Sequence, residues 1–99
     1  MVRDIHFDVL IVGSGAAGLS LALQLPETLS IGLLSKSDLN SGSTSWAQGG
    51  MAAVLHERDT IESHVADTLQ AGAGLCHEDA VTFTVEQSRS VVDWLVAQG

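Results

Sequence analysis

The chain has 99 residues, of which 45% are apolar, and this is enough for one small globular domain. Its formal net charge of −8, with four Lys and Arg against twelve Asp and Glu, argues against binding to nucleic acids or anionic membranes. The single cysteine, Cys76, excludes an intrachain disulfide. No targeting or transmembrane segment is visible, and a cytoplasmic location is therefore expected.

The first predicted element is a strand that ends in a complete glycine motif. Residues Phe7 to Gly18 read F-D-V-L-I-V-G-S-G-A-A-G, an apolar run followed by G-x-G-x-x-G. A motif that ends a strand and opens a helix is typical of dinucleotide-binding sites, and the alternative is a glycine-rich turn in another α/β unit. We expect Gly13 to allow the tight turn, Gly15 to let a pyrophosphate approach the backbone, and Gly18 to let the helix pack closely.

A mostly apolar helix and a second strand are predicted next. The helix covers Ala16 to Leu25 and ends at Pro26, which cannot donate to the helix ladder. The apolar run from Leu29 to Ser35 predicts a strand parallel to the first, which gives a right-handed βαβ unit of about 30 residues. The predicted fold class is α/β, the start of a Rossmann-like domain.

The residues after the second strand do not determine which dinucleotide the chain binds. A site for a free ribose 2′-hydroxyl usually has Asp or Glu at this place, but the chain reads Ser35-Lys36-Ser37, with Asp38 next. A lysine suits a 2′-phosphate, so NADP is an alternative ligand. Lys36 could equally be a solvated residue at the end of the strand, without a role in binding. The glycine motif by itself does not choose between FAD, NAD and NADP.

The segment from Ser37 to Gly50 is predicted to be a loop, because it is dense in Ser, Thr, Asn and Gly. A linker would seldom carry Trp and Gln before a double glycine, so Ser43, Thr44 and Gln48 are candidate donors to phosphates or a ring. The run Met51 to Leu55 predicts a short strand.

Two helices are predicted in the remainder of the chain. The first covers Asp59 to Gly72, capped by Asp59 or Thr60. The second begins near His77 and ends at Gly99, with a bend near Gln87-Ser88. The four histidines lack the spacing of metal ligands, so no metal site is predicted, and Cys76 is expected to be a small buried residue.

Longer motifs give a more specific indication than the glycines. The chain reads D-V-L-I-V-G-S-G-A-A-G-L-S-L-A-L at Asp8 to Leu23, L-L-S-K at Leu33 to Lys36, and G-S-T-S-W-A-Q-G-G-M-A-A-V at Gly42 to Val54. It continues with S-H-V-A-D-T-L-Q-A-G-A-G-L-C at Ser63 to Cys76. In these segments it resembles the flavoprotein family of L-aspartate oxidase and the flavin subunits of succinate dehydrogenase and fumarate reductase, and its Ser35-Lys36 is most similar to the L-aspartate oxidase branch.

The resemblance implies FAD as the cofactor, bound non-covalently. In the respiratory enzymes the corresponding loop resembles H-T-x-x-A-Q-G-G, and its histidine carries covalent flavin. This chain has Ser43 at that position, and a serine has no imidazole nitrogen to form the link.

The implied activity is oxidation of L-aspartate to iminoaspartate, with oxygen or fumarate as the electron acceptor. This is the first step of quinolinate and NAD biosynthesis, with quinolinate synthase as an implied partner. A fumarate reductase or succinate dehydrogenase flavoprotein subunit is the alternative, and an NADP-binding Rossmann module is a third.

The resemblance also implies which residues bind FAD. It implies no catalytic residue within this chain. Residues 1–99 are expected to be the N-terminal part of the FAD-binding domain, inactive alone, with capping and C-terminal helical domains absent. The implied cofactor-binding residues are Gly13, Ser14, Gly15, Ala16, Ala17, Gly18, Lys36, Ser43, Thr44, Ser45, Trp46, Ala47, Gln48, Gly49 and Gly50.

Overall fold

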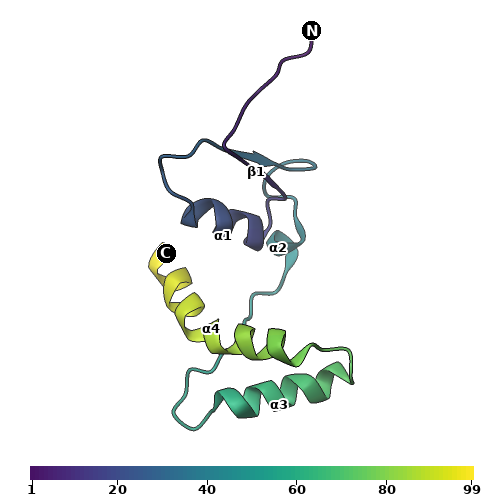
Figure 1. Cartoon of the computed structure of the whole chain (residues 1–99), viewed down its shortest axis with the longest axis vertical. Coiled ribbons are helices and arrows are strands. Elements are labelled where there is room, and N and C mark those ends of the chain that lie inside the picture. Colours follow the sequence, from purple (N-terminus) through teal and green to yellow (C-terminus); the bar gives the residue numbers. More distant parts are fainter. The chain divides into compact units, whose positions relative to one another are not determined.

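The computed structural model describes all 99 residues and divides them into two units, Met1–Gly49 and Gly50–Gly99. The first unit contains β1 (Val9–Val12), α1 (Ala16–Gln24), β2 (Ile31–Leu34) and the short helix α2 (Ser43–Trp46). The second contains α3 (Ile61–Gly72) and α4 (Glu78–Gln98). Figure 1 shows the order of these elements along the chain. No helix is long and apolar enough to span a bilayer.

The first unit is built on a parallel pair of strands. β1 and β2 pair in the register Val9 with Ile31 to Val12 with Leu34, and α1 contacts both strands. Parallel strands need a crossover connection, and α1 supplies it. Ile11 is the buried side chain of this unit, with 6% of its surface exposed. The predicted strand, helix and parallel second strand are therefore confirmed as a mixed α/β unit.

The pairing of β1 with β2 is fixed at its start by Asp8 and Ser30. The Asp8 carboxylate accepts hydrogen bonds from the backbone N–H and the hydroxyl of Ser30, at 2.8 Å and 2.9 Å. The Asp8 N–H donates back to the carbonyl oxygen of Ser30 at 3.0 Å. The hydrogen bond from the Ser30 N–H, and then that from its hydroxyl, lowers the pKa of Asp8 below its ordinary value because both favour the charged carboxylate.

The second unit is a pair of packed helices. α3 begins after Thr60, whose hydroxyl accepts a hydrogen bond from the Ser63 N–H at 3.0 Å, so Thr60 and not Asp59 is the cap. It ends at Ala73 and Gly74, which have positive φ angles of 50° and 86°. α3 packs on α4, and Val85 is buried with 7% of its surface exposed.

The long helix α4 bends within its length. Figure 1 shows it changing direction near its middle, in agreement with the predicted bend. The hydroxyl of Ser90 donates to the Gln87 carbonyl oxygen at 2.9 Å, and a bond of this kind often accompanies a bent helix. His77 is the N-cap residue, and Glu78 and Asp79 lie in the first turn, where negative charge suits the helix dipole.

Two predictions for residues 37–55 were wrong in detail. The predicted loop contains the one-turn helix α2, and the predicted strand Met51 to Leu55 is irregular. In the latter segment the Val54 N–H donates to the Ser88 hydroxyl and the Leu55 carbonyl oxygen accepts from the Arg89 guanidinium, both at 3.4 Å. Side chains of α4 therefore use backbone groups that a neighbouring strand would otherwise pair.

Candidate functional site

A cavity of about 410 Å³ lies at the carboxyl ends of β1 and β2. Its volume falls in the range of about 300–1,000 Å³ typical of small-molecule sites. Three segments that are distant in sequence meet there: the glycine motif, the end of β2, and the loop that leads into α2. The lining residues are Gly13, Ser14, Gly15, Ser35, Lys36, Ser37, Ser41, Gly42, Ser43 and Thr44.

The glycine motif forms the turn between β1 and α1. Gly13 has a φ of +117°, a conformation that an L side chain rarely adopts, and its N–H donates to the Leu34 carbonyl oxygen at 2.8 Å. A Cβ at Gly18 would overlap the carbonyl oxygen of Gly13. The roles expected for the first and third glycines, a tight turn and close packing of helix on strand, are therefore present in the structure.

Hydroxyl groups connect the ends of the two strands. The hydroxyls of Ser14 and Ser35 lie 3.1 Å apart, and the Ser14 hydroxyl donates to the Leu39 carbonyl oxygen at 3.0 Å. Either serine can be the donor in this contact, and the Ser35 hydroxyl also donates to the Asp38 carbonyl oxygen at 3.4 Å. Ser37 and Ser41 hydrogen-bond to each other within the loop that follows.

The start of α1 lies beside this cavity, with its N-cap residue Gly15 in the lining. Helix geometry leaves the first N–H groups without partners inside the helix, and the positive end of the helix dipole lies at the same place. The N-cap residue Gly15 has no side chain, and the first turn has no acidic residue. The Ala16 N–H donates to the Thr44 hydroxyl oxygen at 3.1 Å, which ties α2 to the glycine motif.

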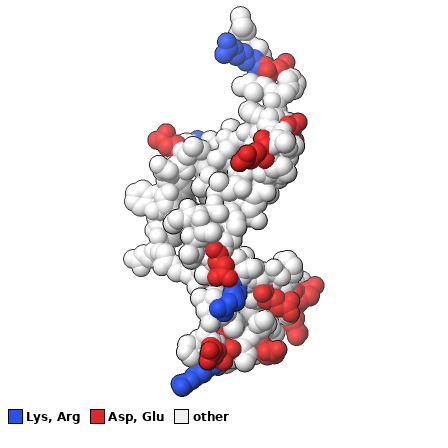
Figure 2. All heavy atoms as spheres, turned by 90° about the vertical axis from the view of Figure 1, so that its left-hand side faces the viewer, with Lys and Arg blue, Asp and Glu red and all other residues white.

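Lys36 is the one charged side chain that lines the cavity, and it is exposed. Eight of the twelve acidic residues lie in residues 50–99 and four in residues 1–49. Figure 2 shows acidic side chains gathered over the part of the molecule where α3 and α4 lie. A cavity beside the start of a helix, with six hydroxyls and a lysine in its lining and in the less acidic unit, is suited to an anionic ligand.

The structure brings together part of the predicted set of site residues. Gly13, Ser14, Gly15, Lys36, Ser43 and Thr44 line the cavity. Ala16, Ala17 and Gly18 form the first turn of α1 behind it and do not line it. Ser45, Trp46, Ala47, Gln48 and Gly49 are exposed away from the lining, and Gly50 is exposed in the second unit.

Sequence reasoning missed four lining residues: Ser35, Ser37, Ser41 and Gly42. The three serines follow β2 at short intervals. Ser35 was predicted to end the second strand, and Ser37 and Ser41 lie in the stretch that was predicted to be a loop on composition alone. A signal was present, since small hydroxyl residues at the carboxyl end of a parallel strand lie where ligands bind in α/β sheets.

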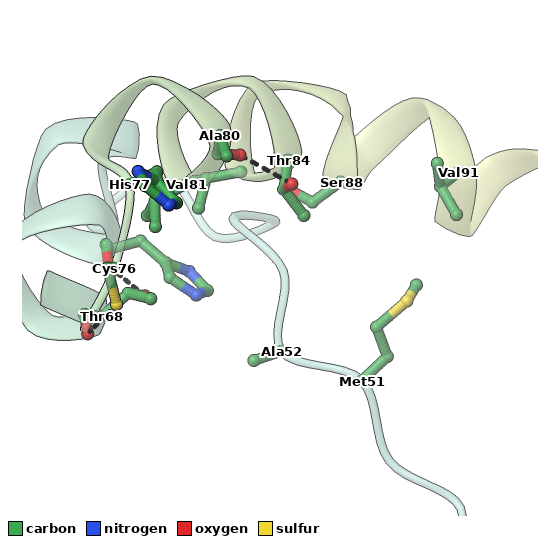
Figure 3. A pocket seen from close by; sticks show the side chains of 12 residues that line it. Met51, Ala52, Thr68, Cys76, His77, Ala80, Val81, Thr84, Ser88 and Val91 are labelled. Carbon is green, nitrogen blue, oxygen red and sulfur yellow. Dashed lines mark hydrogen bonds between the residues drawn. The ribbon is translucent and has the colours of Figure 1, made fainter. Parts of the chain in front are cut away.

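A second cavity of about 480 Å³ lies within residues 50–99. Figure 3 shows Thr68, Cys76, His77 and Ser88 around it, with Met51 opposite α4. Cys76 is half-buried, and its thiol donates to the Thr68 carbonyl oxygen at 3.8 Å. The lining is largely apolar and holds none of the predicted cofactor-binding residues.

Comparison with known proteins identifies the family. The family model described as "FAD binding domain" matches residues 8–99. The chain belongs to the FAD-binding domain family. Its cofactor is therefore FAD, which answers the question that the glycine motif and Lys36 left open between FAD, NAD and NADP.

Named relatives match nearly the whole chain. The chain is 65% identical to an L-aspartate oxidase of Pseudomonas aeruginosa over 99 residues, which is all of this chain and 18% of that protein. It is 60% identical to an L-aspartate oxidase of Yersinia pestis over 92 residues, 93% of this chain and 17% of the relative. An L-aspartate oxidase of Vibrio cholerae is 53% identical over 97 residues, 98% of this chain and 18% of the relative. The chain thus spans less than a fifth of the length of these relatives.

The residues around the first cavity fit FAD. The cofactor carries a pyrophosphate, which suits the N–H groups at the start of α1 and the Lys36 ammonium. Its ribose and ribityl hydroxyls suit the serine hydroxyls at the strand ends.

Proposed function

We propose that this chain is the dinucleotide-binding part of an L-aspartate oxidase. The identity of 65% over all 99 residues to the Pseudomonas aeruginosa L-aspartate oxidase carries this proposal. The reaction would oxidise L-aspartate to iminoaspartate, with removal of one hydride and one proton. Oxygen, which becomes hydrogen peroxide, or fumarate, which becomes succinate, would accept the two electrons.

The parallel β1–α1–β2 unit would be the start of a Rossmann-like domain that holds FAD. The proposed cofactor-binding residues are Gly13 to Gly18, Lys36 and the segment Ser43 to Gly50. Support comes from the cavity, whose lining includes Gly13 to Gly15, Lys36, Ser43 and Thr44. Ser35, Ser37 and Ser41 join this proposed set because they line the same cavity.

The residues of this chain would bind and orient the cofactor rather than act on the substrate. The N–H groups at the start of α1 would hold the pyrophosphate, and Lys36 would supply the nearest positive charge. When bound, FAD supplies the flavin ring that accepts a hydride from the substrate. A dicarboxylate substrate needs cationic partners, and Lys36 is the one cation at this site, so we propose that substrate binding and catalysis depend on residues outside this segment.

Residues 1–99 alone are therefore proposed to be inactive and to bind FAD weakly. The side chains of Leu10, Val12 and Leu34 on the two strands are more than half exposed, and a sheet of two strands leaves apolar faces uncovered. We propose that the active protein functions in the cytoplasm and that its product feeds quinolinate synthase in NAD biosynthesis.

Peroxide release by the full-length protein tests this proposal. L-Aspartate should give hydrogen peroxide in the presence of oxygen, and succinate should not. Succinate-dependent reduction of an artificial acceptor without activity on L-aspartate would instead support a succinate dehydrogenase or fumarate reductase flavoprotein subunit.

A further inference from the structure

Two segments 28 residues apart meet at a single oxygen atom. The Thr44 hydroxyl oxygen accepts a hydrogen bond from the Ala16 N–H at 3.1 Å. The same oxygen is the nearest atom to the place of a Cβ on Gly15, at 3.3 Å. Thr44 therefore lies directly on the first turn of α1, and Figure 1 shows α2 beside this end of the helix.

Thr44 supplies what the start of α1 lacks in its own sequence. The N-cap residue Gly15 has no side chain to accept from the helix, and no Asp or Glu lies in the first turn. A hydroxyl oxygen is a neutral acceptor, whereas a phosphate oxygen is an anionic one, and anionic acceptors form stronger hydrogen bonds with N–H donors at a helix start. The Thr44 hydroxyl and a cofactor phosphate would therefore compete for one N–H donor.

The α2 segment has few other contacts to hold it in place. α2 does not pack broadly on any strand or other helix, and the side chain of Trp46 is 83% exposed. The loop before it is tied to itself through Ser37, Ser41 and the Asp38 carbonyl oxygen, and to the glycine motif through the bond from the Ser14 hydroxyl to the Leu39 carbonyl oxygen. Loss of the bond between Ala16 and Thr44 would therefore free α2 from the start of α1, while Leu39 in the preceding loop stays bonded to Ser14.

We propose that Thr44 is an exchangeable cap of α1, which a phosphate oxygen of FAD replaces at the Ala16 N–H when the cofactor binds. This rests on the proposed placement of the pyrophosphate at Gly13 to Gly18. Exchange of the acceptor moves Thr44 and with it the segment Ser43 to Gly50, which we have proposed to contact the cofactor. Occupation of the phosphate site thereby determines the position of the second cofactor-binding segment.

Residue-resolved amide hydrogen exchange on the full-length protein, with FAD removed and then restored, tests this inference. Thr44→Val keeps the side-chain volume but removes the acceptor, and Thr44→Ser keeps the acceptor. Ser45→Ala is the matched control, because Ser45 is in the same turn of α2 and its side chain makes no hydrogen bond.

Without FAD, the Ala16 amide should exchange about two- to tenfold faster in Thr44→Val than in the wild type, as expected for loss of one hydrogen bond. Thr44→Ser and Ser45→Ala should match the wild type. Saturation with FAD should make Ala16 equally protected in all four proteins, because a phosphate oxygen then holds the N–H.

Equal exchange of Ala16 in the wild type and Thr44→Val without FAD would overturn the role of Thr44 as a cap. A difference that persists unchanged at saturating FAD would overturn the replacement by phosphate. Neither result depends on turnover, so failure of the L-aspartate oxidase activity is observed separately, in the peroxide assay.

Discussion

The hydroxyls of Ser14 and Ser35 hydrogen-bond to each other at 3.1 Å, across the carboxyl ends of β1 and β2. Ser14 lies between the first two glycines of the motif, and Ser35 directly follows β2. The bond therefore joins the phosphate turn to the loop that carries Lys36.

Replacement of Ser35 by alanine should weaken FAD binding. The change removes the hydrogen bond between residue 35 and Ser14, and a hydrogen bond of this kind contributes about 0.5–1.5 kcal/mol, so the dissociation constant should rise by about two- to tenfold. Fluorescence titration of the full-length protein with FAD measures this. Ser63→Ala is the control, since Ser63 is an exposed serine of α3 outside the cavity, and an equal loss of affinity in both variants would contradict the role given to Ser35.

Replacement of Gly18 by alanine should destabilise the protein. Alanine gains about 0.5–1 kcal/mol in helix preference over glycine, but its Cβ would overlap the Gly13 carbonyl oxygen, and overpacking typically costs about 1–3 kcal/mol. The overlap should prevail because a backbone carbonyl in a tight turn cannot rotate away. The midpoint of thermal unfolding should therefore fall in Gly18→Ala and stay unchanged in Gly42→Ala, where a Cβ would enter open space.

The bond between Asp8 and Ser30 should make stability depend on pH in the acidic range. The pKa of Asp8 is lower in the fold than its ordinary value of 3.8, so folding favours the charged form. The stabilisation is fully present above pH 3.8 and is lost as the pH falls through the lower pKa of the folded protein.

The variant Asp8→Asn should accordingly be less stable than the wild type at neutral pH, and the difference should narrow below pH 3.8. Unfolding by denaturant across this pH range measures the difference. Asp4→Asn provides the control, because the Asp4 side chain makes no hydrogen bond. A constant gap between Asp8→Asn and the wild type at all pH values would exclude the carboxylate as its cause.

The first unit was predicted well because its signals are local. The apolar run before Gly13, the glycine spacing and Pro26 together determine β1, α1 and the approximate start of β2. Pairing of the strands then brings residues 13–15 and residues 35–37 to one edge of the sheet. This proximity cannot be read from the order of the residues in the sequence. Thr44 is held at this edge by one hydrogen bond, to Ala16, which lies 28 residues earlier in the sequence. No periodic sequence pattern predicts this contact.

The segment from Met51 to Leu55 was mispredicted because its structure depends on non-local contacts. Its composition favours a strand, but a strand needs a neighbour, and the nearest groups are the Ser88 and Arg89 side chains of α4. The helix α2 was missed because its four residues are too few to show helical periodicity among serines and a threonine.

FAD should be released in full when the full-length protein is denatured. Ser43 lines the cavity at the position where the resemblance implies a flavin-linking histidine in the respiratory enzymes, and a hydroxyl cannot form the same bond to the flavin. After acid precipitation and washing, all the yellow colour should be in the supernatant. Flavin that stays with the pellet would show a covalent bond at another residue.

The central claim, that this chain binds the FAD of an L-aspartate oxidase, is tested most directly by the absorption spectrum of the full-length protein mixed with substrate without oxygen. Bound FAD absorbs in the visible range, and its reduction by substrate abolishes that absorption. We predict that L-aspartate bleaches the bound flavin, that succinate does not, and that admission of oxygen restores the colour. A flavin that is bleached by succinate and unaffected by L-aspartate would contradict the claim, as would a purified protein that binds no flavin.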